Sequence, residues 1–296
     1  MDLVPLDFCE RVAAAWKCCE EKVSTFLNVS FRWKCVTPVF STRLWAFSRN
    51  PNPTRFSVFT DARGEWRYNF RLESDIDLTM SELLEHPDFK NLRIDSIRIN
   101  RNHAANRMNP VSDVGMEKLL NFVSFLANEP RVFIDNQNAS NFSSPEGVIL
   151  LSWLEQRWFS YIDFWTYHSA FNQLLQKQFS RRIPTKIYVG GVIEDKQFLA
   201  DQLRSGQMTR FQAHCSMFSS DVMEGIVQSF LRSPEKMKID IEACFDGSTE
   251  GHLMEMEKGG LCRRVDGKFI FENPFHRLEV SNSYYSVWKC VSVKSE

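Results

Sequence analysis

The chain has 296 residues, of which 43% are hydrophobic and 25% are charged, and its formal net charge at pH 7 is −1. These proportions are typical of a folded globular protein and exclude a disordered, collagen-like or coiled-coil chain. Lys and Arg (36) do not outnumber Asp and Glu (37). The excess of positive charge that drives binding to nucleic acids is therefore missing, and we expect no nucleic-acid partner.

The first residues do not have the pattern of a secretory signal peptide, because three acidic residues precede Arg11 and no adequate apolar stretch follows. No run of 18 apolar residues predicts a membrane-spanning helix. Four of the eight cysteines lie in the first 35 residues, a distribution unlike that of a disulfide-stapled secreted module. We expect an intracellular protein, cytoplasmic or nuclear, with free thiols and no membrane partner.

Two regions are expected along the chain: an N-terminal helical segment over residues 1–35 and an α/β repeat domain over residues 36–296. Residues 6–27 have a pattern suited to a helix that caps the domain. The first expected β-element is a hairpin over Arg55–Leu72, where apolar residues alternate around the turn Asp61–Gly64.

One unit then recurs from about Asp77 to Cys244: a helix-period apolar stretch, a short turn and a short strand. The predicted helix residues and the strands that follow them are Met80, Leu83, Leu84 with Arg93–Ile99; Met116, Leu119, Leu120, Val123 with Arg131–Asp135; Val148, Leu151, Leu154 with Tyr161–Thr166; Phe171, Leu174, Leu175, Phe179 with Thr185–Val189; Phe198, Leu199, Leu203 with Thr209–Ala213; and Val222, Ile226, Val227, Phe230, Leu231 with Lys236–Ile241.

The strand centres are 24 to 35 residues apart, a spacing typical of stacked repeats. A single helix–strand unit cannot bury its apolar face alone, so neighbouring units share a core, and their strands run parallel. The predicted fold is therefore α/β: a leucine-rich-repeat-like solenoid of helix–strand units with parallel strands. The alternative is a doubly wound α/β domain, although the Gly-rich turn usual after its first strand is absent.

The C-terminal end is expected to hold a second hairpin and one further strand. Leu261–Val265 and Lys268–Phe271 flank Asp266-Gly267, the residue pair preferred in a type I′ turn. Tyr284–Val293 is predicted as a single closing strand. With the first hairpin, these elements are expected to form β-hairpin caps at both ends of the repeat stack.

The sequence contains no recognised catalytic or nucleotide-binding motif, and we expect no catalytic residue, cofactor or metal site. Gly247–Gly251 lacks the central serine of a nucleophile elbow, the turn that carries the catalytic serine of many hydrolases, and is interpreted as a flexible loop. His214-Cys215 has the residue types of a base and a nucleophile. The two are neighbours on a predicted strand, so their side chains point to opposite faces and are not expected to form such a pair. Asp75 and Asp77 have a spacing that can hold a divalent cation, but this spacing is too common to predict a site.

Two groups of side chains are candidates for binding a protein partner. A basic stretch contains Arg93, Arg98, Arg101, His103 and Arg107; we expect a solvated rim there, with contact to an acidic partner as the alternative. An aromatic cluster, with plain core filling as the alternative, contains Trp153, Trp158, Phe159, Tyr161, Phe164, Trp165 and Tyr167. From this cluster, Trp158, Tyr161 and Trp165 are predicted as partner-binding residues.

The N-terminus places an apolar-Pro pair, Val4-Pro5, before apolar residues three, four and seven places later: Phe8, Cys9 and Val12. This pattern resembles the opening of an F-box helix, and the whole chain resembles the nematode-specific families related to F-box proteins. The resemblance implies that these five residues dock on the Skp-type adaptor of a cullin ubiquitin ligase. It also implies that the repeat region holds the substrate of that ligase.

The sequence therefore favours a non-enzymatic protein–protein interaction scaffold, with the role of a ubiquitin-ligase substrate receptor added by the resemblance. The alternative is an α/β hydrolase or transferase with an unrecognised active site. A deep pocket lined by perturbed carboxylates or histidines would favour the enzyme, and a shallow sheet face would favour binding.

Overall fold

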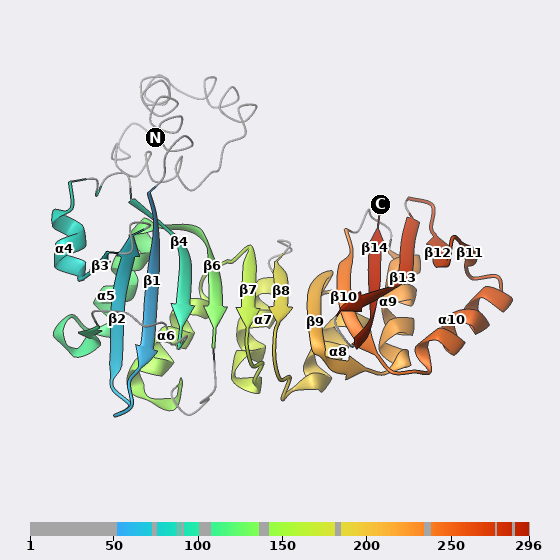
Figure 1. The fold of residues 1–296 in the computed structure, drawn as a ribbon, viewed down its shortest axis with the longest axis horizontal. Helices are drawn as coiled ribbons and strands as arrows, with labels where there is room; N and C mark the ends of the chain where they lie inside the picture. The colour runs from blue at the N-terminus through green and yellow to red at the C-terminus, as the bar shows by residue number, and fades with distance from the viewer. Residues whose placement is uncertain are drawn as a thin grey trace, which may run out of the picture.

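A computed structural model describes residues 52–72, 76–87, 89, 92–100, 108–135, 142–180, 185–233, 238–275, 277–285 and 288–295. The strands in chain order are β1 Asn52–Thr60, β2 Trp66–Leu72, β3 Asp77–Leu78, β4 Leu92–Ile99, β5 Asn109–Pro110, β6 Ala127–Ile134, β7 Tyr161–Phe164, β8 Lys186–Val189, β9 Arg210–Phe218, β10 Asp240–Phe245, β11 Arg263–Val265, β12 Lys268–Glu272, β13 Arg277–Tyr285 and β14 Trp288–Ser295. All fourteen belong to one open sheet that runs the length of the molecule (Figure 1).

The central part of the sheet is parallel, and its strands follow one another in chain order. The order across the sheet is β11-β12-β13-β14-β10-β9-β8-β7-β6-β4-β1-β2-β3, with β5 paired to β2. From β1 to β10 every pair is parallel, whereas the pairs beyond β1 and beyond β10 are antiparallel. The strand order does not reverse anywhere in the described parallel part, so it has no switch point of the kind that defines a doubly wound sheet.

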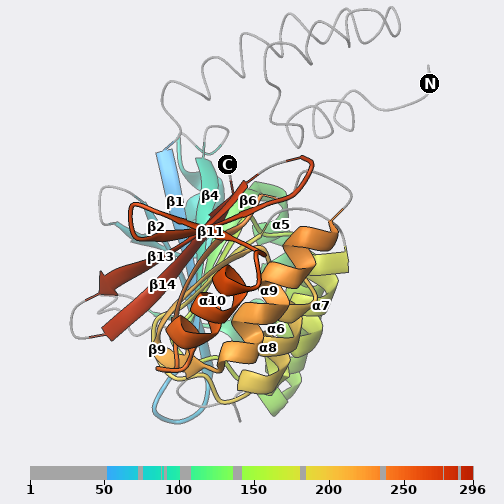
Figure 2. The same ribbon diagram turned by 90° about the vertical axis from the view of Figure 1, so that its right-hand side faces the viewer.

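Seven α-helices lie in the described residues: α4 Met80–Glu85, α5 Met116–Leu126, α6 Pro145–Glu155, α7 Asn172–Ser180, α8 Lys196–Arg204, α9 Ser220–Arg232 and α10 Thr249–Lys258. Short 3-10 helices cover Val111–Asp113 and Ser169–Phe171. The helices α5 to α10 gather on one side of the sheet (Figure 2). This arrangement follows from the strand order, because successive right-handed crossovers that step in one direction place their helices on the same face.

Local sequence signals explain where several of these helices begin. Thr79 caps α4 in a capping box with Glu82, whose side chain accepts a hydrogen bond from the Thr79 backbone N–H at 2.7 Å. Ser144 accepts from Gly147 N at 3.1 Å and is followed by Pro145, which suits the first helical position. Asp195 caps α8 by accepting from Phe198 N at 3.2 Å.

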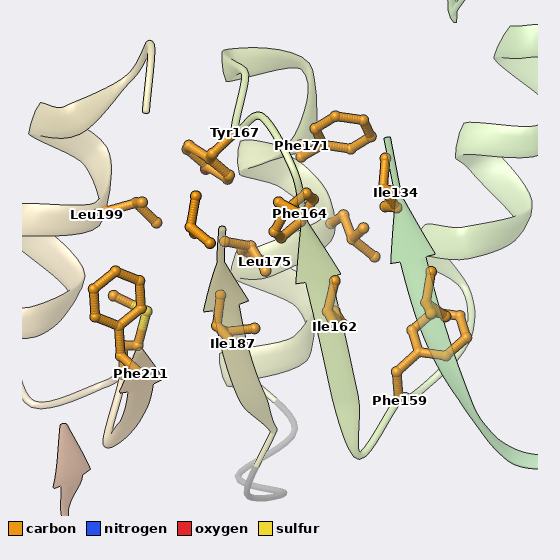
Figure 3. Close-up of a cluster of buried hydrophobic side chains, with 14 of the residues drawn as sticks. Ile134, Phe159, Ile162, Phe164, Tyr167, Phe171, Leu175, Ile187, Leu199 and Phe211 are labelled. Atoms are coloured by element: carbon orange, nitrogen blue, oxygen red, sulfur yellow. The ribbon is translucent and has the colours of Figure 1, made fainter. Parts of the chain in front are cut away.

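The core fills the space between the sheet and the helices (Figure 3). Ile162 and Phe164 of β7 and Ile187 of β8 meet Leu175 of α7 there, and none of these side chains has accessible surface. Full burial of each such side chain contributes about 1.5–3 kcal/mol of transfer free energy. The helix layer is therefore held to the sheet by hydrophobic contacts from every unit.

The six predicted helix–strand units are confirmed as elements, and with them the mixed α/β architecture with a large, mostly parallel sheet. In α6 the predicted apolar face is only partly right: Leu154 is buried as predicted, but Val148 is 55% exposed and Leu151 only partly buried. The other buried side chains of this face are Leu150 and Trp153. Apolar residues occupy four consecutive positions there, so their periodicity does not define one face. The last strand of the series also lies further along the chain than predicted, at Asp240–Phe245.

Both predicted hairpins are confirmed. β1 pairs antiparallel with β2, and β11 with β12. Asp266 and Gly267 have φ values of 50° and 77°, as a type I′ turn requires. The single strand predicted over Tyr284–Val293 is wrong, because this stretch is divided between β13 and β14, which pair antiparallel.

The flexible loop predicted at Gly247–Gly251 is also wrong, since Gly251 lies inside α10. Only Thr249, Leu253 and Met256 of this helix are buried, an apolar stripe too thin to indicate a helix from the sequence. The N-terminal helical segment and its boundary with the α/β domain at residues 35 and 36 lie outside the described residues.

Candidate functional site

The side of the parallel strands that faces away from the helices is the open face of the sheet (Figure 2). Side chains alternate between the two faces along each strand. In β7, Ile162 and Phe164 are buried against the helices, so Tyr161, Asp163 and Trp165 belong to the open face. The same alternation places Phe133 of β6 and Tyr188 of β8 there.

These side chains form an aromatic patch in the middle of the open face. Its members are Phe133, Tyr161, Trp165 and Tyr188. The ring centroids of Phe133 and Tyr161 are 5.9 Å apart. In the strand register Phe133 is level with Asp163, which is level with Tyr188. Trp165 directly follows β7 and is 52% exposed, whereas the other three rings are partly buried.

Gly190 allows two rings of the aromatic patch to come together. A Cβ atom at this position would lie 3.1 Å from Cε1 of Tyr188 and 3.5 Å from Cε3 of Trp165. Both rings therefore cover the backbone of Gly190. At the next residue, Gly191, a Cβ atom would lie 2.3 Å from the carbonyl oxygen of Trp165, a distance that no real side chain adopts.

Cationic side chains border the aromatic patch. The guanidinium carbon of Arg98 on β4 lies 5.6 Å from the ring centroid of Phe133, within the range of a cation–π interaction. Arg131 is exposed, and in the strand register Tyr161 lies between Arg131 and Lys186. Basic groups thus lie on both sides of the ring of Tyr161.

The predicted aromatic cluster divides between the core and the surface. Trp153, Phe159, Phe164 and Tyr167 are buried, so for these four residues core filling is the correct interpretation. Of the three predicted partner-binding residues, the structure brings Tyr161 and Trp165 together on the open face. Trp158 is half-buried and lines a separate pocket.

That pocket has a volume of about 400 Å³ and lies between the C-terminal parts of α5 and α6 and the start of β6. Trp153, Arg157 and Trp158 line it together with Pro130. The guanidinium carbon of Arg157 lies 4.9 Å from the ring of Trp153. Burial lowers the pKa of the Arg157 guanidinium, yet arginine keeps its proton in proteins, so the pocket contains a fixed positive charge.

The described residues bring together no group of three or more His, Cys, Asp or Glu side chains that could hold a metal ion. Two histidines each face one carboxylate: His168 and Glu194 at 3.2 Å, and His252 and Glu224 at 3.1 Å. The backbone of His214-Cys215 lies in β9 as predicted, but their side chains are not among the described ones.

The remaining candidates fall partly outside the described residues. Asp77 accepts a hydrogen bond from Nδ2 of Asn69 at 2.9 Å, while Asp75 lies outside. In the basic stretch, Arg93 and Arg98 lie on β4, while Arg101, His103 and Arg107 lie outside. The predicted adaptor-binding residues also lie outside; they are Val4, Pro5, Phe8, Cys9 and Val12.

The sequence analysis did not predict Phe133 and Tyr188 as surface residues, nor Arg157 as a pocket residue. The first two could have been found, because each is an aromatic residue between two β-branched residues, Val132 and Ile134 or Ile187 and Val189. In a strand whose apolar flanks face a core, the central ring must face outward. No comparable signal exists for Arg157, whose surroundings come from three separate elements.

Comparison with protein-family models, with curated proteins and with solved structures found no match to this chain. Among the helices of the described residues, none is long and apolar enough to cross a membrane.

Proposed function

We propose that this protein is a non-enzymatic scaffold that binds an extended, acidic segment of another protein on the open face of its sheet. The aromatic patch supports this function best, because it combines the exposed Trp165 with three partly buried rings beside arginine side chains. Aromatic and arginine residues are enriched at the centres of protein interfaces. Arg98, Arg131 and Lys186 supply positive charge around these rings, so the partner segment is expected to carry carboxylates.

A protein segment suits this surface better than a nucleic acid does. Asp163 lies between Phe133 and Tyr188 in the strand register, and Glu242 lies further along the same row, level with Gln212. These carboxylates would repel a continuous phosphate backbone, whereas a peptide can place neutral side chains beside them. The formal net charge of −1 also disfavours a nucleic-acid ligand.

We propose further that the helix–strand units form a leucine-rich-repeat-like solenoid and that the terminal hairpins cap it. The sequential strand order supports this architecture, as does the packing of α5 on α6, α6 on α7 and α8 on α9. Contacts between successive units are the property that distinguishes a repeat stack from other α/β folds. In this architecture each unit contributes one strand to a shared binding surface on the open face.

The resemblance of the N-terminus to an F-box extends the proposal to a partner-specific role. Val4, Pro5, Phe8, Cys9 and Val12 would dock on a Skp-type adaptor inside the cell, and the open face would hold the protein to be ubiquitylated. In this role the acidic segment bound on the open face is the recognition signal of the substrate.

Peptide selection tests the open face directly. Random peptides displayed on phage are selected on the wild-type chain, and the affinities of the winners are measured again on an Arg131→Glu/Lys186→Glu variant. We expect winners rich in Asp and Glu that also contain apolar residues. Charge reversal should weaken them about tenfold or more, because like charges placed against each other cost several kcal/mol.

Lys118→Glu provides the matched control, because Lys118 is exposed on α5, on the helix side of the sheet. The control should leave peptide affinity unchanged. Winners without acidic residues, or winners that bind the reversed variant as well as the wild type, would show that the open face is not the site. Competition by a single-stranded oligonucleotide at the same concentration would favour a nucleic-acid ligand instead.

A Phe8→Asp substitution in the full chain tests the ligase role. Purified Skp-type adaptor should bind the wild-type chain, and the substitution should abolish this binding while leaving the thermal melting temperature unchanged. If the adaptor fails to bind the wild type, the chain remains a scaffold without the ligase role.

A further inference from the structure

A row of basic side chains crosses the open face of the sheet, and we call it the basic row. Its members are Arg55 of β1, Arg131 of β6, Lys186 of β8 and Arg210 of β9. The residue after each member is buried in the core; these residues are Phe56, Val132, Ile187 and Phe211. Because side chains alternate between the two faces of a strand, all four basic residues face away from the helices. Arg131 is exposed and the others are partly exposed, so a partner can reach them.

The strand register places the members of the basic row at one level of the sheet. Arg55 is level with Ser96 of β4, which is level with Arg131. Arg131 is level with Tyr161 of β7, which is level with Lys186. The side chains between these three basic residues are neutral. A chain that crosses the strands at this level therefore meets positive charge at regular intervals.

The basic row ends on β9. Ile187 of β8 is level with Phe211 of β9, so the preceding residues, Lys186 and Arg210, are level as well. Beyond Arg210 the next residue at this level is Asp240 of β10, a carboxylate. Five steps between neighbouring strands separate β1 from β9, so at about 4.8 Å per step the basic row is about 24 Å long.

The next row of the open face, two residues further along the strands, differs in charge. Its members are Phe133, Asp163, Tyr188, Gln212 and Glu242. An acidic segment that follows β7 would pass from Tyr161 to Asp163 on the same face and meet a like charge. A segment that crosses the strands along the basic row instead meets positive and neutral side chains at that level, from β1 to β9.

The backbone of these strands does not set the direction of a bound segment. The strands β1, β4, β6, β7, β8 and β9 each pair with a neighbour on both sides. A peptide therefore cannot join this part of the sheet as a further strand. Side chains hold the peptide, and the charges of the basic row favour a path across the strands.

We propose that the partner of the open face is an acidic run of about eight or more residues that crosses the strands along the basic row. This inference rests on the proposed function and adds the direction and length of the bound segment. An extended chain rises about 3.3 Å per residue, so about eight residues reach across about 24 Å. Alternate side chains of such a chain face the sheet, where carboxylates can pair with the four basic residues.

The probe for the test is a fluorescein-labelled peptide of ten residues in which glutamate and serine alternate. Its affinity for the full-length chain is measured by fluorescence anisotropy at about 0.15 M salt, where exposed charges more than about 8 Å apart are largely screened. Arg55→Glu and Arg210→Glu alter the two ends of the basic row. Each should weaken binding about fivefold or more, because a repulsion replaces an ion pair.

Arg63→Glu is the matched control, because Arg63 is exposed in the turn between β1 and β2 and lies outside the basic row. It changes the net charge by the same amount and should leave the affinity for the probe unchanged. Equal weakening by this control would show a general effect of charge and would overturn the crossing path. No saturable binding of the probe to the wild type would overturn the acidic run.

An Arg131→Glu/Lys186→Glu variant separates this inference from the proposed function. If this variant binds the probe as well as the wild type does, the open face is not the site and the proposed function fails with it. If the variant binds more weakly but Arg55→Glu or Arg210→Glu binds normally, the open face is the site and only the crossing path is wrong.

Photo-crosslinking to the wild-type chain measures the direction without any substitution. Benzophenone is attached to one end or the other of the same peptide, and the labelled residues are identified by mass spectrometry. The two peptides together should label β1 or β2 on one side of the basic row and β9 or β10 on the other. Crosslinks confined to the two ends of a single strand would show that the segment follows the strand, contrary to the proposal.

Discussion

Tyr167 joins three segments of the chain through polar contacts at the edge of the core. Its hydroxyl donates to Oδ1 of Asn172, and Nδ2 of Asn172 donates to Oδ2 of Asp195 at 2.7 Å. The other carboxylate oxygen of Asp195 caps α8. The ring packs edge-on against Phe164 and stacks on Phe198. One side chain thus links the end of β7 to the starts of α7 and α8.

A Tyr167→Phe substitution is expected to lower the free energy of unfolding by about 1–2 kcal/mol, the usual effect of removing one partner of a buried hydrogen bond. The ring contacts with Phe164 and Phe198 should persist, so the loss reflects the hydroxyl alone. Urea denaturation at pH 7 measures the change. Equal stability of the variant would show that the hydroxyl makes no net contribution.

The free energies of unfolding of the wild type and of Tyr167→Phe can also be compared by urea denaturation at high pH. Burial raises the pKa of Tyr167 above its ordinary value, so above about pH 10 the unfolded chain loses a phenol proton that the folded chain keeps. The folded wild type therefore becomes less stable as pH rises through this range. Phenylalanine has no proton to lose, and we expect the stability advantage of the wild type to shrink.

At the scale of elements, the contact between α8 and α9 depends on a glycine. A Cβ atom at Gly225 of α9 would lie 2.6 Å from Cγ of Arg204 and 3.0 Å from its Cα atom. Arg204, the last residue of α8, also pairs with Asp201 of its own helix and with Asp221 of α9. The absence of a side chain at Gly225 lets the two helices approach this closely.

Two glycine-to-alanine substitutions in α-helices are therefore expected to have opposite effects. Gly225→Ala should destabilise the fold by about 1–2 kcal/mol, because crowding against Arg204 outweighs the gain in helix propensity. Gly251→Ala, at an exposed position of α10 with open space around it, should stabilise by roughly 0.5–1 kcal/mol. Thermal denaturation of both variants measures the difference, and a stabilising Gly225→Ala would show that the helices can separate without cost.

At the scale of the whole molecule, the periodic apolar residues were sufficient to predict six helix–strand units and their parallel strands. Val132-Phe133-Ile134 and Phe211 to Ala213 show why: in each, buried residues alternate with a partly buried one, and a strand with one face against the helices leaves this local signal. The same reasoning failed for α10, whose few buried residues leave a weak pattern. It also failed for β13 and β14, because Ser286 and Val287 between them include none of the Gly, Pro, Asn or Asp residues that usually mark a turn.

The candidate sites were less predictable, because they depend on which residues become neighbours. Trp158 and Tyr161 are three positions apart in the chain, yet one lines a pocket and the other stands on the open face. The meeting of Trp165 and Tyr188 over Gly190 depends on the pairing of β7 with β8. Local periodicity contains no information about such contacts.

The sequential strand order also affects how this chain can change over evolutionary time. Because every crossover joins adjacent strands on the same side, duplication of one helix–strand unit would add one strand, about 4.8 Å of width, without rethreading any other connection. Loss of one unit would narrow the surface by the same amount. Descendants of this gene could therefore fit ligands of different lengths by gaining or losing whole helix–strand units, while the side chains of each existing strand stay unchanged.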